Sequence, residues 1–139
     1  MKTASEIQGD IYRFIRNDIA LCSMISGDVY RNGYRPRDSR LEDIVVTFTA
    51  GNVADIETGV VTINIYVPDI DPYQNGVFVQ DGQRTAELES AAARWVKSMT
   101  ADKSNYLFRL RNTIYTEQEP DIKQHFVVVA LQYSYCGNE

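Results

Sequence analysis

Residues 44–67 read IVVTFTAGNVADIETGVVTINIYV, and this stretch decides the fold class of the chain. Side chains alternate between two faces in residues 44–49 and again in residues 60–67, which is the period of a β-strand. The residues between them, 50–59, contain turn-forming glycine and asparagine. The stretch therefore predicts an antiparallel hairpin. Its return strand presents one apolar face, made of Val61, Ile63, Ile65 and Val67.

Two helical patterns flank this hairpin along the chain. Residues 6–25 place apolar side chains at the spacing of one helix face, and Thr3 with Glu6 has the spacing of a capping box. Residues 83–99 form the second pattern. The stripes predicted to be buried are Ile7, Ile11, Phe14 and Ile15 in the first helix, and Leu88, Ala92, Trp95, Val96 and Met99 in the second.

Three further strands complete the pattern. Val29 and Tyr30 predict a short strand, residues 106–116 a longer one, and residues 126–135 a final strand with one apolar face. The predicted order is α-β-β-β-α-β-β, in one α+β domain covering residues 1–139. We expect an antiparallel or mixed sheet with both helices packed on one face, leaving the other face half exposed or used for contacts.

Composition sets the broad class of protein. The chain has 139 residues, of which 44% are hydrophobic and 24% charged, as in a globular domain. The formal net charge of −5 argues against a protein whose main task is to bind nucleic-acid phosphates. The polar start lacks a secretion signal, and the longest strongly apolar run, residues 126–131, is far too short to cross a membrane. We therefore expect a cytoplasmic protein without a membrane partner. Cys22 and Cys136 are expected as reduced thiols, with a disulfide as the alternative.

Signatures of catalytic or cofactor chemistry are missing from the sequence. There is one histidine, His125, expected at the edge of a strand, and no nucleophile signature, spaced zinc ligands or phosphate-binding loop. Asp69 and Asp71 lie on one side of an extended segment, but neither reads as the start of a calcium loop. We therefore expect a protein that is not an enzyme and has no metal or cofactor.

Charge is unevenly distributed along the chain. Residues 31–40 contain four arginines and one aspartate, a net charge of +3, so the remaining residues carry −8 to reach −5. A domain with a basic loop and several acidic loops suits head-to-tail self-assembly, although solvated charges on a monomer are the alternative. We expect the reversal of two of Arg35, Arg37 and Arg40 to glutamate to weaken assembly in a salt-sensitive way, with the melting temperature of the monomer nearly unchanged. The candidate interface residues are Arg31, Tyr34, Arg35, Arg37 and Arg40, and the candidate loop acids are Asp55, Glu57, Asp69 and Asp71.

The layout resembles a known family of phage proteins. The helix, three strands, helix and strands of a chain near 140 residues are similar to the tail terminator and tail completion proteins of long-tailed phages, the head–tail joining or neck proteins of the lambda-type minor tail class. The linker at residues 69–82 and the last hairpin through Pro120 depart from that layout. The segments that carry the resemblance are 24–30, 35–36, 42–48, 61–67 and the alanine-rich helix with Trp95, within residues 5–136.

The resemblance implies a structural role in a phage or prophage. Such a chain would form a ring, a hexamer when assembled, that caps the tail tube and joins it to the head connector. DNA would pass through the lumen without specific binding, and the loop acids would line that lumen and repel phosphates. The protein would be in the host cytoplasm during assembly and then in the tail or neck of the virion.

Two alternatives remain open from the sequence. One is a small metal-dependent hydrolase or nuclease that uses Asp69, Asp71 and Asp81. The other is a nonviral protein-interaction module of the same fold class. Metal binding in a titration would favour the hydrolase over a structural protein. Neighbouring genes for capsid and tail-tube proteins would favour the phage protein over the nonviral module.

Overall fold

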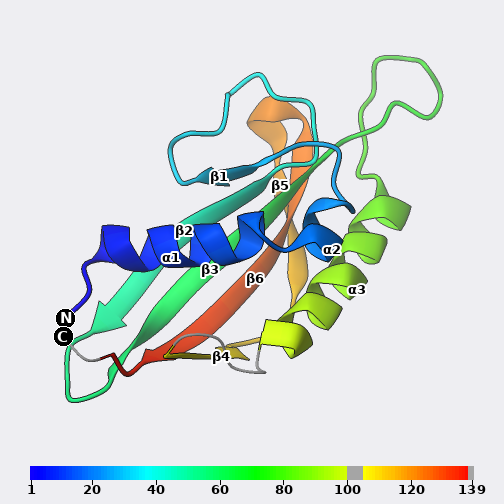
Figure 1. Ribbon diagram of the computed structural model, residues 1–139. Coiled ribbons are helices and arrows are strands. Elements are labelled where there is room, and N and C mark those ends of the chain that lie inside the picture. Colours follow the sequence, from blue (N-terminus) through cyan, green and yellow to red (C-terminus); the bar gives the residue numbers. More distant parts are fainter. Residues whose placement is uncertain (100–104, 138–139) are drawn as a thin grey trace.

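The hairpin of residues 44–67 forms the middle of a six-stranded mixed sheet (Figure 1). We describe residues 1–99 and 105–137 of a computed structural model of the chain. Strands β2 (Ile44–Asn52) and β3 (Glu57–Pro68) pair antiparallel, and β1 (Val29–Arg31) adds to β2 in parallel. Strand β6 (Gln124–Tyr135) pairs antiparallel with β3 along the whole length of both strands. The single α+β domain with the order α-β-β-β-α-β-β is confirmed.

The first helical segment differs in one respect from the prediction. Helix α1 (Ala4–Arg16) begins at the predicted capping box, in which Thr3 and Glu6 bond each other's backbone amides. The chain then breaks, because Asp18 is extended and its side chain accepts a bond from the Leu21 amide. A short second helix, α2 (Ile19–Cys22), starts at this cap. The single helix predicted over residues 6–25 is therefore two helices.

The strand predicted over residues 106–116 is also interrupted. Strands β4 (Tyr106–Leu110) and β5 (Tyr115–Glu119) both pair with β6 and lie end to end along its second edge. From Leu110 to Tyr115 the chain advances five residues, whereas β6 advances three, from Leu131 to Val128. The two extra residues cannot stay in the ladder, so the strand bends there. β5 ends in the 3-10 turn η1 (Pro120–Ile122), which leads into β6.

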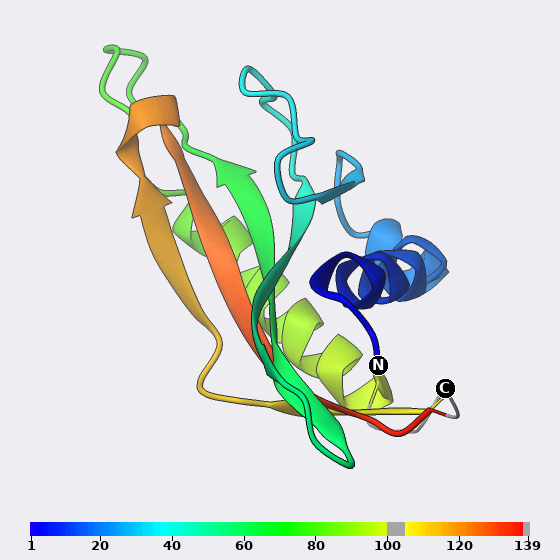
Figure 2. The same cartoon turned by 90° about the vertical axis from the view of Figure 1, so that its left-hand side faces the viewer.

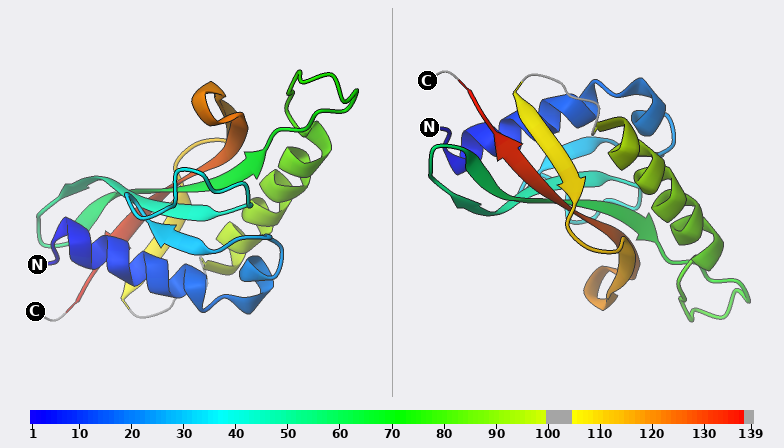
Figure 3. Two further views of the ribbon diagram at one scale, coloured as in Figure 1. Left: turned by 90° about the horizontal axis from the view of Figure 1, so that it is seen from above. Right: turned by 90° about the horizontal axis from the view of Figure 1, so that it is seen from below.

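Both main helices cover the same face of the sheet, as Figures 2 and 3 show. Helix α3 (Gly82–Met99) contacts α2, which in turn contacts α1. In its predicted stripe Leu88, Ala92, Trp95 and Val96 are buried, whereas Met99 is only half-buried. The helices meet the alternating apolar residues of β3 and β6, and this face forms the core. On β3 and β6 those residues are Val61, Ile63, Ile65, Val67, Val127, Val129, Leu131, Tyr133 and Tyr135.

None of the described helices covers the opposite face of the sheet, which is half exposed, as expected. Val45, Asn64 and Val128 lie in one row across β2, β3 and β6. Val45 and Val128 are buried, whereas the neighbouring Thr47 and Thr62 remain half-buried. The loop that follows β1 shields one end of this face, and that loop contains most of the candidate interface arginines.

Candidate functional site

The Arg35 side chain is largely buried between the loop that follows β1 and the sheet face opposite the helices. Its guanidinium Nε is 2.8 Å from Asp43 Oδ2, and the two side chains are only 9% and 0% exposed. A second guanidinium nitrogen donates to Gln124 Oε1 at 2.9 Å, and the group stacks 4.1 Å from the centre of the Tyr66 ring. Asp43 also accepts bonds from the Ser39 hydroxyl and the Asp28 amide. This cluster fastens the loop to the sheet.

Two more candidate arginines make bonds within the chain. The Arg31 side chain turns toward α1, where it donates to Gln8 Oε1 and to the Ser5 carbonyl, both at 3.0 Å. Arg40 donates to the Ile122 carbonyl at 2.6 Å and so joins the loop to the turn before β6. Arg31, Arg35 and Arg40 thus have hydrogen-bond partners within the chain, and their assignment to an interface stays a prediction.

Tyr34 and Arg37 are the two candidate residues that the fold leaves available. Tyr34 is 75% exposed, and Arg37 is exposed near the tip of the loop. Neither side chain has a hydrogen bond or ion pair within residues 1–99 and 105–137. The accessible part of the predicted basic patch is consequently smaller than the sequence indicates.

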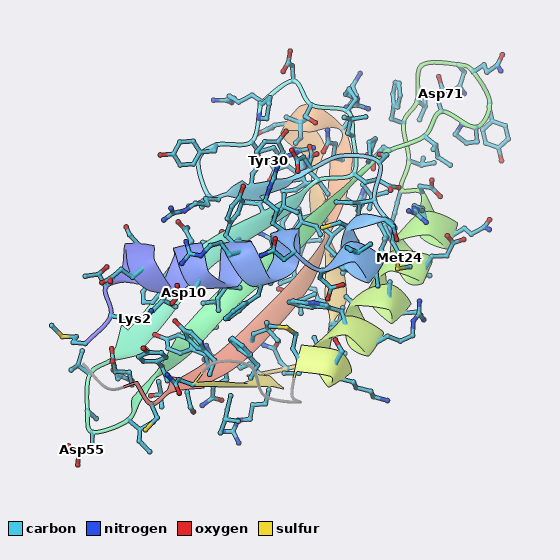
Figure 4. The ribbon with its side chains drawn as sticks, viewed as in Figure 1. Lys2, Asp10, Met24, Tyr30, Asp55 and Asp71 are labelled. Atoms are coloured by element: carbon cyan, nitrogen blue, oxygen red, sulfur yellow. The ribbon has the colours of Figure 1, made fainter. Side chains whose placement is uncertain are left out.

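The four candidate acids lie at opposite ends of the sheet. Asp55 is at the tip of the β2–β3 hairpin, and Asp71 lies beyond the far end of β3 (Figure 4). At a rise of about 3.3 Å per residue, the strand that separates Glu57 from Asp69 is about 40 Å long. Glu57 accepts a bond from the Lys2 amide at 2.9 Å, so it also has a structural partner. The four acids therefore do not form one continuous surface.

Asp69 forms a pair that the sequence does not reveal. Its Oδ1 atom is 2.6 Å from Nδ1 of His125, and both side chains are largely buried. The pair results from the register of β3 and β6, which places Val67 opposite His125. A cavity of about 440 Å³ lies beside the pair, with Phe78, Val79 and Lys123 among its lining residues. No short-range motif could connect residues that are 56 positions apart.

The other two acids of the hydrolase alternative hold backbone in place. Asp71 accepts bonds from the amides of Asn75 and Gly76, and Asp81 accepts one from the Arg84 amide at the start of α3. Within the described parts of the chain, no three His, Cys, Asp or Glu side chains form a group that could hold a metal ion. The geometry thus gives no support to the hydrolase alternative.

The linker predicted at residues 69–82 forms a projecting arm, which we define as residues 69–81. A pair of hydrogen bonds between Ile70 and Val79, each 2.9 Å, closes it into a hairpin at its base. The arm extends away from the body of the domain (Figure 1). Five of its apolar side chains are exposed, Tyr73 (84%) and Val77 (59%) more than Ile70, Phe78 and Val79. The sequence singles out the length of this linker but not its apolar surface.

A second exposed apolar surface lies on β4. Leu107 is 62% exposed and Leu110 is also exposed, in an edge strand that pairs only with β6 within the described residues. Arg109 and Arg111 are exposed beside them. Sequence reasoning misses this surface, because an edge strand is recognised only once the order of the sheet is known.

The cysteines are separate free thiols in the structure. Cys22 is half-buried and donates to the Ile15 carbonyl, and burial raises the pKa of its thiol. Cys136 is exposed just after β6. The two thiols are therefore not bonded to each other, and Cys22 is partly buried whereas Cys136 is not.

Comparisons with known proteins give a structural likeness but no family. No family model matches the chain, and no curated protein matches it. Ten solved protein chains match. One of them, whose name gives no function, is 15% identical with a TM-score of 0.39, over 98% of this chain and 93% of that chain. None of the described helices is long and apolar enough to cross a membrane.

Proposed function

We propose that this chain is a structural virion-assembly subunit of a phage or prophage, similar to tail terminators. In this role it forms a ring, a hexamer when assembled, that caps the tail tube and contacts the head connector. DNA passes through the ring without specific binding. The proposal assigns no catalytic reaction and no cofactor to the chain.

The apolar arm is the observation that carries this proposal. A monomer gains nothing from holding Tyr73 and Val77 in water, because burial of such a side chain is worth about 1.5–3 kcal/mol. The arm is nevertheless built as an ordered hairpin, closed by the Ile70–Val79 bonds and held by the Asp71 carboxylate. Ordered, exposed apolar surface of this kind is typical of a site that another protein covers.

The charge distribution supports the same role. The net charge of −5 disfavours tight binding of DNA phosphates. It suits a ring through which DNA passes without being bound. The buried Arg35–Asp43 pair and the Asp69–His125 pair hold the loop and the arm in fixed positions. Fixed surface features let a subunit meet its neighbours with little loss of conformational entropy.

Growth of tail tubes tests the proposal. Tail-tube protein is polymerised with and without equimolar amounts of this protein, and tube lengths are measured over time by electron microscopy. A terminator binds the growing end, so we expect tube lengths to stop increasing soon after addition. Tubes that grow equally fast at every protein concentration and salt would contradict the proposed role.

A further inference from the structure

We infer that the arm of one copy of this chain adds as a strand to the outer edge of β4 in a second copy. The inference rests on the proposed function, because it names the contact by which the subunits join. It assigns the exposed apolar surfaces of the arm and of β4 to one interface.

The outer edge of β4 has backbone groups available for a further strand. The Asn105 carbonyl accepts from the Cys136 amide, and the Arg111 amide donates to the Ala130 carbonyl. In an antiparallel ladder the bonding direction alternates, so the backbone groups of Tyr106, Phe108 and Leu110 point away from β6. Within the described residues, β4 pairs with β6 alone. An edge of this kind is a template for pairing with another chain.

The arm offers a matching edge. Val79 uses its backbone amide and carbonyl to bond Ile70. Because the bonding direction alternates along a strand, the backbone groups of its neighbours Phe78 and Gln80 point away from Ile70. The amides of Phe78 and Gln80 accordingly have no hydrogen-bond partner in the parts of the chain that the structure describes. Residues 77–80 can thus bond a second strand without giving up the bonds that close the arm.

Charge complementarity favours this pairing over others. Apart from Asp69, which is paired with His125, the arm contains Asp71 and Asp81 and no lysine or arginine, although Lys123 Nζ lies 4.6 Å from the centre of its Phe78 ring. Residues 105–114 contain Arg109, Arg111 and no acid. The exposed leucines of β4 provide apolar surface for Val77 and Phe78. The neighbouring edge strand β5 carries Glu117 and Glu119, which would repel the arm. The arm is therefore directed to β4.

The position of the two surfaces requires two copies. The arm lies beyond one end of the sheet and β4 lies at the other, as the views of Figures 1 and 2 agree. One copy cannot pair its arm with its own β4 across that distance. A contact between two different surfaces is head-to-tail, and it closes into a ring when the rotation between copies is suitable. Strand addition is an established mode of recognition between proteins.

Complementary variants test the inference directly. The arm variant is Tyr73→Asp with Val77→Asp, and the edge variant is Leu107→Asp with Arg109→Glu. A control variant, Ile19→Asp with Arg94→Glu, makes the same kinds of change on exposed helical residues. Native mass spectrometry and sedimentation are run on wild type and on each variant alone, and on an equimolar mixture of the arm and edge variants, after melting curves establish that all are folded.

The expected pattern is specific to a head-to-tail contact. Wild type and the control variant form oligomers larger than dimers, whereas the arm variant and the edge variant are each monomeric. Their mixture forms a 1:1 heterodimer and nothing larger, because only one intact arm and one intact edge remain. A mixture that stays monomeric while wild type assembles, or either variant assembling like wild type, would overturn the inference.

Disulfide trapping supplies a second readout that does not depend on disruptive variants. Copies with Val77→Cys are mixed with copies with Arg109→Cys, both in a Cys136→Ser background, and oxidised. We expect a mixed disulfide dimer, and none when Glu117→Cys replaces Arg109→Cys; equal trapping of both would contradict the inference.

A heterodimer without arrest of tube growth would leave this contact standing and remove the phage role. Arrest of tube growth without the heterodimer would support the phage role and overturn this contact.

Discussion

Replacement of Arg35 by methionine should destabilise the monomer, although sequence reasoning places this residue on an interface. Methionine keeps much of the apolar stem but removes the guanidinium that faces Asp43, whose side chain is 0% exposed. Loss of one partner from a buried ion pair costs about 3–5 kcal/mol, because the remaining charge has no compensation. Ser39 and the Asp28 amide still donate to Asp43, so we expect the lower end, about 3 kcal/mol.

The measurement is the unfolding of purified monomer by urea and by heat. For a chain of this length, about 3 kcal/mol corresponds to a fall in melting temperature of about 10 °C. Arg37→Met is the matched control, since Arg37 lies in the same loop, is exposed, and should melt within about 2 °C of wild type. In the double variant Arg35→Met with Asp43→Asn, we expect a loss smaller than the sum of the two single losses. If Arg35→Met melted like Arg37→Met, the Arg35–Asp43 pair would have no structural role and the reasoning would fail.

Two further predictions concern the body of the domain. Burial acts to raise the pKa of Asp10, but hydrogen bonds from Lys2 and Tyr106 and the charges of Lys2 and Arg13 outweigh it, so this pKa lies below its ordinary value of 3.8. Because the folded-state pKa is lowered, the stabilisation is present above about pH 4. This stabilisation should disappear as the pH falls through the folded-state pKa. In urea titrations, the difference in free energy of unfolding between wild type and Asp10→Asn should therefore decrease below pH 4. A difference that stays constant with pH would contradict this. Gly59→Ala should lower the free energy of unfolding by about 1–3 kcal/mol, because its Cβ would collide with the Ala50 carbonyl and the Tyr133 ring; unchanged urea unfolding would show that the sheet relaxes there at little cost.

Periodicity in the sequence is enough to predict the elements and the buried face. Ile7, Ile11 and Ile15 are buried as one stripe, and the alternation in β3 and β6 identifies the core side of both strands. These patterns succeed because they depend on burial along a single element. The breaks at Asp18 and after Leu110 are missed because a local cap and the register against β6 decide them.

The candidate site is harder to predict, because its residues acquire their roles through distant partners. Arg35 reads as a surface charge until the fold places Gln124, 89 residues away, beside it. Asp69 reads as a loop acid until strand register brings His125 to it. Composition shows the imbalance of charge, but only the tertiary structure shows that three of the four arginines in residues 31–40 form hydrogen bonds within the chain.

The exposed apolar surface of the arm could not be predicted from the sequence. Its length and its Pro72 and Gly76 indicate a loop, and loops are usually assumed to be polar. The apolar residues of the arm form no long periodic pattern, so nothing in the sequence separates a buried loop from an exposed one. The exposure of Tyr73 and Val77 in an ordered hairpin is what directs attention to assembly.

Electron microscopy of tail-tube ends tests the central claim most directly. Tubes are incubated with wild type, with the arm variant Tyr73→Asp with Val77→Asp, or with the control variant Ile19→Asp with Arg94→Glu, and the fraction of ends that carry a ring is counted. We predict rings on most ends with wild type and with the control variant, and at least a tenfold smaller fraction, an order-of-magnitude expectation for loss of a central apolar contact, with the arm variant. Bare ends with wild type, or equal capping by the arm variant, would contradict the account.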